Sequence, residues 1–208
     1  DGGLIVAIIS NATTIADAGS FSVGLGDMTL IKTLDVSGGA NATLVHGSSS
    51  VVFDGTYGVY IIKLINVHPV DDRVDFTMNF TTDGTNFNVS KQTTAIEVYN
   101  WENDSTPAFA YRDLDLANST GEQSIAIGCG SDNDECISSI IYVFNPSSTS
   151  YTKHFLIDTQ FSEGQGINFR QPVQGYCNTT TAITGVRFKF ASGNIDSGTF
   201  KLYGIKDS

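Results

Sequence analysis

The chain has 208 residues, of which 22 are acidic and 11 basic, so its formal net charge is −11 at pH 7. This length fits one domain, because domains commonly run to about 100–200 residues. A composition that is 40% hydrophobic and 16% charged, with 21 glycines, is typical of a turn-rich globular protein and excludes a disordered chain. The negative charge repels phosphate backbones and the basic residues form no stripe, so nucleic acid is not an expected partner.

The first 27 residues differ from the rest in how apolar and polar residues are distributed. An apolar run, Leu4 to Ile9, precedes small and polar residues and a second apolar stretch, Phe21 to Leu25. The first run is far below the roughly 18–20 residues that span a bilayer, so no membrane insertion is expected. Residues 1–27 are predicted to be either an N-terminal arm that adds a strand to a neighbour or the first hairpin of the main domain, which covers residues 28–208.

From residue 28 onward the dominant hydrophobic period is two. Phe76, Met78 and Phe80 alternate with polar residues, and the segment 186–190 has the same pattern. Such alternation predicts half-buried antiparallel strands. The segments 59–67 and 137–144 are apolar on both faces, which predicts central strands that are covered on both sides.

Turn residues separate these segments at short intervals. Pairs such as Asp54-Gly55, Asp83-Gly84 and Ser197-Gly198 tolerate positive φ, and no segment of ten residues sustains a period of 3.6. The predicted fold is therefore all-β, a single antiparallel β-sandwich. The residues expected in its core are Val59, Ile61, Phe76, Met78, Phe80, Ile141, Val143, Phe188, Phe190 and Leu202.

The three cysteines do not form a zinc-binding spacing, and an odd number cannot all pair within one chain. Their favoured interpretation is three ordinary thiols. The spacing also allows a disulfide between Cys129 and Cys136, which would require α-carbons within roughly 7 Å.

Catalysis is not expected from these residues. The histidines His46, His68 and His154 are scattered, and the chain contains no GxSxG nucleophile motif. Asp113 and Asp115 alternate on one segment, but the sequence places no two carboxylates across a sugar. The prediction is a non-enzymatic protein without a cofactor.

Two segments are candidate binding sites. Asp132, Asp134 and Glu135 lie in one acidic loop and are a weak candidate for a hard cation such as calcium; the alternative is a solvated hairpin tip. Tyr99 and Trp101 lie in a polar segment, where exposed aromatic rings would contact a sugar or a protein partner; the alternative places them in the core.

A further set of segments carries a resemblance to a known family: 28–34, 57–69, 83–91, 131–134, 144–148, 153–155, 178–183 and 188–205. Together they resemble a family of β-rich virion structural proteins of marine tailed bacteriophages, of the cyanophage or pelagiphage type. The resemblance covers roughly residues 28–206.

The resemblance implies a jelly-roll-like sandwich in a virion protein that is assembled in the host cytoplasm. The implied partners are further copies of the chain, capsid or tail proteins, and a host surface glycan. A capsid decoration or head-fibre role is favoured, because the chain lacks the repeats of long fibre shafts. A tail-associated carbohydrate-binding receptor module is the alternative, and a polysaccharide depolymerase is less favoured.

Overall fold

The computed structural model describes residues 8–10, 13–17, 20–21, 28–105, 107–163 and 165–206. These residues form β-strands and no helix, so none of them belongs to a helix that could cross a membrane. The strands are β1 (Ile8–Ser10), β2 (Thr13–Asp17), β3 (Ser20–Phe21), β4 (Met28–Gly39), β5 (Ala42–Val45), β6 (Val59–Pro69), β7 (Val74–Thr81), β8 (Lys91–Trp101), β9 (Ala108–Tyr111), β10 (Gln123–Cys129), β11 (Ile137–Phe144), β12 (Lys153–Glu163), β13 (Ile167–Cys177), β14 (Gly185–Phe190) and β15 (Ile195–Ile205).

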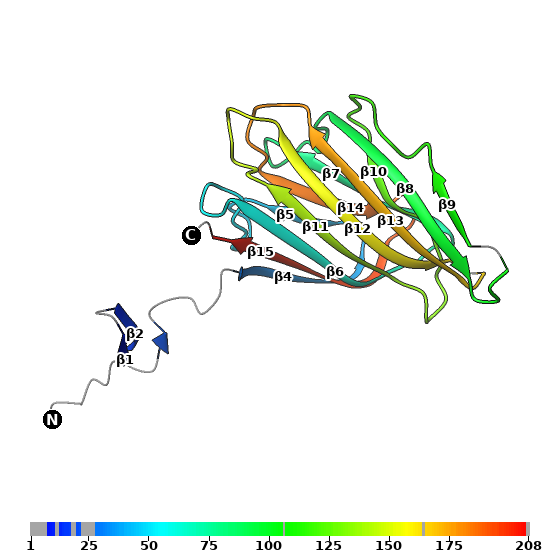
Figure 1. Cartoon of the computed structure of the whole chain (residues 1–208), viewed down its shortest axis with the longest axis horizontal. Coiled ribbons are helices and arrows are strands. Elements are labelled where there is room, and N and C mark those ends of the chain that lie inside the picture. Colours follow the sequence, from blue (N-terminus) through cyan, green and yellow to red (C-terminus); the bar gives the residue numbers. More distant parts are fainter. Residues whose placement is uncertain are drawn as a thin grey trace.

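Two antiparallel sheets stack face to face (Figure 1). The large sheet has the order β4-β15-β6-β11-β12-β13-β8-β9, and the small sheet has the order β10-β7-β14-β5. The chain passes repeatedly from one layer to the other, because β4, β6 and β8 lie in the large sheet and β5, β7 and β10 in the small one. The predicted all-β antiparallel sandwich is confirmed, while its jelly-roll connectivity stays a prediction.

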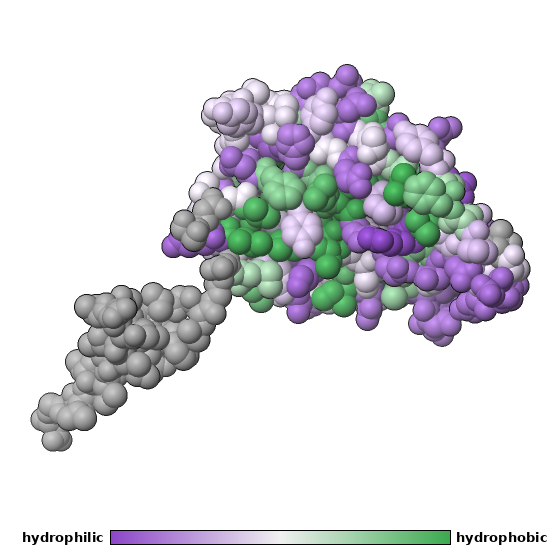
Figure 2. Space-filling view, in the orientation of Figure 1, coloured by the Kyte–Doolittle hydropathy of each residue, from purple (hydrophilic) through white to green (hydrophobic). Residues whose placement is uncertain are grey.

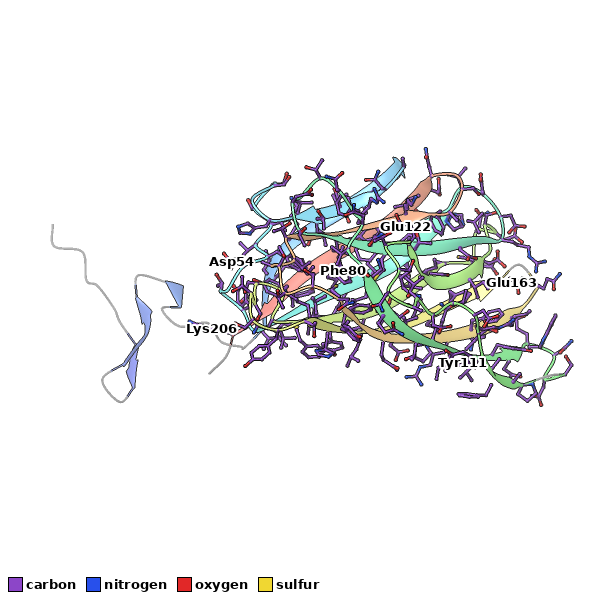
Figure 3. All side chains as sticks on the ribbon, turned by 90° about the horizontal axis from the view of Figure 1, so that it is seen from above. Asp54, Phe80, Tyr111, Glu122, Glu163 and Lys206 are labelled. Atoms are coloured by element: carbon purple, nitrogen blue, oxygen red, sulfur yellow. The ribbon has the colours of Figure 1, made fainter. Side chains whose placement is uncertain are left out.

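Aromatic rings from both sheets meet between the layers. Phe188 and Phe76 both belong to the small sheet, and their ring centroids lie 6.2 Å apart. The ring of Phe188 also lies 5.5 Å from that of Phe200, which belongs to the large sheet. Phe80 lies 5.2 Å from Phe155, and Figure 3 shows Phe80 between the two layers. All five side chains are buried, and each such burial stabilises the fold by about 1.5–3 kcal/mol.

The predicted core is confirmed except at Val59. The other nine residues are buried, whereas Val59 is only partly buried. The strand period explains the exception, because Tyr60, Ile62 and Leu64 of β6 point inward and the alternate residues point outward. Ile61 also points outward, but its neighbours on adjacent strands leave it only 6% exposed.

The expectation that two segments are central strands covered on both sides is half correct. β6 lies between β15 and β11, and β11 lies between β6 and β12, so both strands are central. The sandwich has two layers, however, and Ile65, Ile140 and Tyr142 on the outer face of these strands are exposed. Nothing in the described part of the chain covers this face.

The sandwich begins at Met28 with β4, while β1, β2 and β3 pair with one another in a three-stranded sheet. The prediction that residues 1–27 form an arm for a neighbour depends on the run Leu4 to Ile9. Most of that run lies outside the described residues.

Candidate functional site

The outer face of the large sheet carries the most distinctive surface of the molecule. Along β11, Ser138, Ile140 and Tyr142 point outward and alternate with buried residues. Along β12, the outward residues are His154, Leu156, Asp158 and Gln160. Figures 1 and 2 look onto this face, and Figure 2 shows apolar residues gathered over its middle.

The strand register aligns these side chains in rows across the sheet. One row is Tyr203, Ile61, Tyr142, Leu156 and Gln174, each residue directly opposite the next on the neighbouring strand. Such lateral neighbours have Cβ atoms about 4.5–5.5 Å apart, so their side chains touch. The row is therefore a continuous, mainly apolar strip.

The apolar side chains of this strip and of the row beside it include three whose exposure is unusual for the centre of a sheet. Ile140 is 41% exposed, Tyr142 37% and Leu156 45%. Soluble monomers rarely expose large contiguous apolar patches, and such patches commonly mark binding surfaces. We call the set Ile61, Ile65, Ile140, Tyr142 and Leu156 the apolar patch.

An ion pair borders the apolar patch. The Arg170 guanidinium on β13 donates to the Asp158 carboxylate on β12 through two bonds, Nε to Oδ1 at 2.9 Å and Nη2 to Oδ2 at 2.8 Å. Hydrogen bonding to this carboxylate raises the pKa of Arg170. Both side chains are more than half exposed, so the pair contributes little to stability and is available to a ligand.

A hollow of about 590 Å³ lies beyond this pair, at the margin formed by β13, β8 and β9. Phe109, which is 70% exposed, stands at the hollow and pairs laterally with Val98. The residues that line the hollow are Val98, Tyr99, Asn100, Pro107, Ala108, Phe109, Gln160, Asn168 and Arg170. We call it the Phe109 hollow.

Tyr99 and Trp101 both lie on the inward side of β8, partly buried against the core. Tyr99 lines the Phe109 hollow, and its ring lies 5.4 Å from the ring of Phe169. Trp101 is partly buried against the core and lines none of the hollows found among the described residues. The core alternative therefore describes both residues better than an exposed contact does, although Tyr99 also lines the Phe109 hollow.

The acidic loop lies elsewhere, between β10 and β11. Its Asp134 and Glu135 line a different hollow, which includes His68 and Asp196. Glu135 is nearly buried and accepts a hydrogen bond from the Asp132 backbone N–H at 2.9 Å, which closes the loop on itself. Among the described residues, no three carboxylate, histidine or cysteine side chains are arranged to hold a metal ion, so the calcium candidate receives no support.

Two histidine side chains connect neighbouring segments through polar contacts. His68 contacts the Asp132 backbone oxygen through Nε2 at 3.1 Å and the Asp196 carboxylate through Nδ1 at 3.3 Å. The Nδ1 of His46 accepts a hydrogen bond from the Phe53 backbone N–H at 3.1 Å. These contacts hold the backbone in place.

All three cysteines are free, and Cys129 and Cys136 are not joined by a disulfide. Cys129 and Cys177 are buried, which raises the pKa of each thiol to about 12. A thiol with so high a pKa is a poor nucleophile at neutral pH.

Neither the apolar patch nor the Phe109 hollow is among the sites predicted from the sequence. Two patterns indicated them: central strands that are apolar on both faces, and the alternation of Phe109 with Tyr111 beside a turn. The first pattern is equally typical of strands that are covered by further layers, so it does not distinguish a buried face from an exposed one.

Comparison with known proteins adds no relative: no family model matches the chain, and no curated protein or solved structure matches it significantly.

Proposed function

We propose that the protein is a non-enzymatic structural component on the exterior of a bacteriophage particle, of the capsid decoration or head-fibre type. It acts by binding, and its contacts with neighbouring copies and other virion proteins are made through the apolar patch. The phage assignment rests on the sequence resemblance described above. The assembly role rests on one structural observation, the exposure of apolar side chains at the centre of the large sheet.

The size of the large sheet suits such a role. Strands of 11 residues such as β6 and β12, at about 3.3 Å per residue, and eight strands about 4.8 Å apart outline roughly 1,200 Å². A stable protein interface buries about 800 Å² on each partner. The face is therefore large enough to hold a neighbour without help from other surfaces.

The composition of the apolar patch also suits a protein contact. Interface centres are enriched in aromatic and large apolar residues and depleted in charge. The apolar patch is rich in such residues, and its charged neighbours are few: Lys63 and Asp158 lie opposite Ile140 on the two adjacent strands, and Asp158 is paired with Arg170.

The test is the composition of purified particles of the phage that encodes the chain. We expect quantified protein bands to show hundreds of copies per particle. A handful of copies would instead place the protein at the tail tip, as in the receptor-module alternative, and absence from the particles would refute the proposal.

A variant pair connects this test to the apolar patch. Leu156→Asp puts a charge at the centre of the patch, and Thr43→Asp puts the same charge on the exposed outer face of the small sheet. We expect Leu156→Asp to reduce incorporation at least tenfold and Thr43→Asp to leave it unchanged. Release of reducing ends from host polysaccharide by the purified protein would support a depolymerase and contradict the non-enzymatic role.

A further inference from the structure

The Phe109 hollow is chemically different from the apolar patch. It combines an exposed aromatic ring with several amide side chains, whereas the apolar patch consists of aliphatic side chains and Tyr142 and contains no amide side chain. Small-ligand sites commonly have volumes of about 300–1,000 Å³ and pair apolar walls with a few polar groups. The hollow, at about 590 Å³, has these properties.

Two aromatic side chains stand exposed on the edge strand β9: Phe109, which lines the hollow, and Tyr111, which lies beside it and outside its lining. Phe109 is 70% exposed and Tyr111 is 60% exposed, and both stand on the outer face, opposite Val98 and Ile96. Exposed aromatic residues on an edge strand are an aggregation hazard that proteins usually avoid. A ligand that covers the rings explains their presence.

The spacing of the two rings favours an extended ligand. Residues two apart on a strand are about 6.6 Å apart along it, so the two rings form adjacent platforms on one face. Figure 3 shows the side chain of Tyr111 on the outer side of the large sheet. Consecutive rings of a chain-like ligand could each contact one platform.

The polar groups supply both donors and acceptors. The Gln160 side-chain NH₂ donates to the Asn168 side-chain oxygen, which leaves the Gln160 oxygen and the Asn168 NH₂ facing solvent. The Asn100 side chain is exposed at the hollow. Arg170 uses Nε and Nη2 on Asp158, so its Nη1 donors remain for a ligand.

The charge of the lining residues and of the whole chain favours a neutral ligand over an anionic one. The only cationic group of the hollow, Arg170, is already paired with Asp158, and the chain carries a net charge of −11. Phosphate and carboxylate ligands would find no unpaired cation among the lining residues. A neutral ligand with hydroxyl groups and apolar ring faces satisfies the amides and the aromatic rings together.

We propose that the Phe109 hollow is a binding site for a neutral oligosaccharide that lies along β9, with sugar ring faces on Phe109 and Tyr111. Asn100, Asn168 and the free Arg170 donors bind its hydroxyl groups. This site goes beyond the assembly role of the apolar patch and is compatible with either position of the protein in the particle.

The test is a titration of the intact protein with neutral cello-, malto- and chito-oligosaccharides, and with inorganic phosphate and heparin as anionic probes, by calorimetry or NMR. We expect at least one neutral oligosaccharide to bind at millimolar or lower concentration, and neither anionic probe to bind. Phe109→Ala should weaken the binding about tenfold. Tyr151→Ala, a similarly exposed aromatic in the β11–β12 loop, should leave it unchanged.

Phe109→Ala is expected to keep the wild-type melting temperature, because the side chain is exposed. Failure of every neutral probe to bind, equal binding by Phe109→Ala, or preference for an anionic probe would each overturn the site. Loss of particle incorporation in Phe109→Ala would show that the hollow is a protein contact and would also overturn it. A failure of Leu156→Asp to affect incorporation bears only on the apolar patch, so the two proposals are tested separately.

Discussion

At the scale of single residues, the least expected feature is a row of buried polar groups inside the sandwich. Lys153, Cys177 and Lys91 lie side by side on the neighbouring strands β12, β13 and β8, all facing inward and all almost fully buried. The Lys91 ammonium donates to the Asn79 side-chain oxygen at 2.6 Å and to the Val89 carbonyl at 2.8 Å. Burial lowers the pKa of Lys91 to about 8, and no carboxylate of the described residues forms a salt bridge with it.

This lowered pKa predicts a stability that rises with pH. Between pH 8 and 10.5 the unfolded chain keeps a proton on Lys91 that the folded chain has released, so the free energy of unfolding increases through this window. The increase is about 3 kcal/mol at most. Urea unfolding at pH 7 to 10 should show wild type gaining stability relative to Lys91→Met as the pH rises. The exposed Lys206→Met is the control, and parallel curves for wild type and Lys91→Met would contradict the prediction.

The cysteines give a second residue-scale prediction. Cys129 and Cys177 are buried and Cys136 is partly exposed, so a thiol reagent such as Ellman's at pH 8 should label one thiol quickly in the native protein. In denaturant it should label three. A total of one would instead reveal a Cys129–Cys136 disulfide.

At the scale of the strands, packing between β7, β14 and β15 holds the two layers together. Phe188 on β14 is fully buried and lies against rings from β7 and β15. Truncation of such a side chain leaves a cavity that its neighbours fill only in part.

Phe188→Ala should therefore lower the free energy of unfolding by about 3–5 kcal/mol, measured by urea denaturation. Tyr151→Ala, which truncates an exposed ring, should change it by less than about 0.5 kcal/mol. Similar small losses in both variants would show that Phe188 is not a core residue.

The strands also show how far the sequence alone predicts this protein. A period of two depends only on backbone geometry, so it identified Phe76, Met78, Phe80 and Phe188 as inward-facing. It does not tell how many layers the fold has, because Ile140 and Leu156 look the same in sequence whether another layer or a partner covers them. The Phe109 hollow depends on strand order, since residues 100, 109, 160 and 168 meet only after four strands have paired.

At the scale of the whole molecule, charge opposes the association that we propose for the apolar patch. The net charge of −11 keeps separate copies apart at neutral pH, and the charge approaches zero near the isoelectric point of about 4.4. The balance between repulsion and apolar contact therefore depends on pH.

Light scattering should accordingly rise as the pH falls from 7 towards 4.4. The double variant Ile140→Thr and Leu156→Thr should reduce this rise, because it removes much of the apolar patch without changing the net charge. Tyr151→Thr should behave like wild type. Equal scattering by the double variant and the wild type would mean that another surface drives the association.

The position of β9 has a consequence for how this surface can change. β9 is the last strand of the large sheet and pairs only with β8, so its side chains contribute nothing to the packing between Phe188, Phe76 and Phe200. Substitutions or insertions near Phe109 can alter what the margin binds while the interior stays intact. Evolution towards new ligands, or the grafting of a foreign binding sequence by an engineer, should therefore cost the least folding stability at this margin.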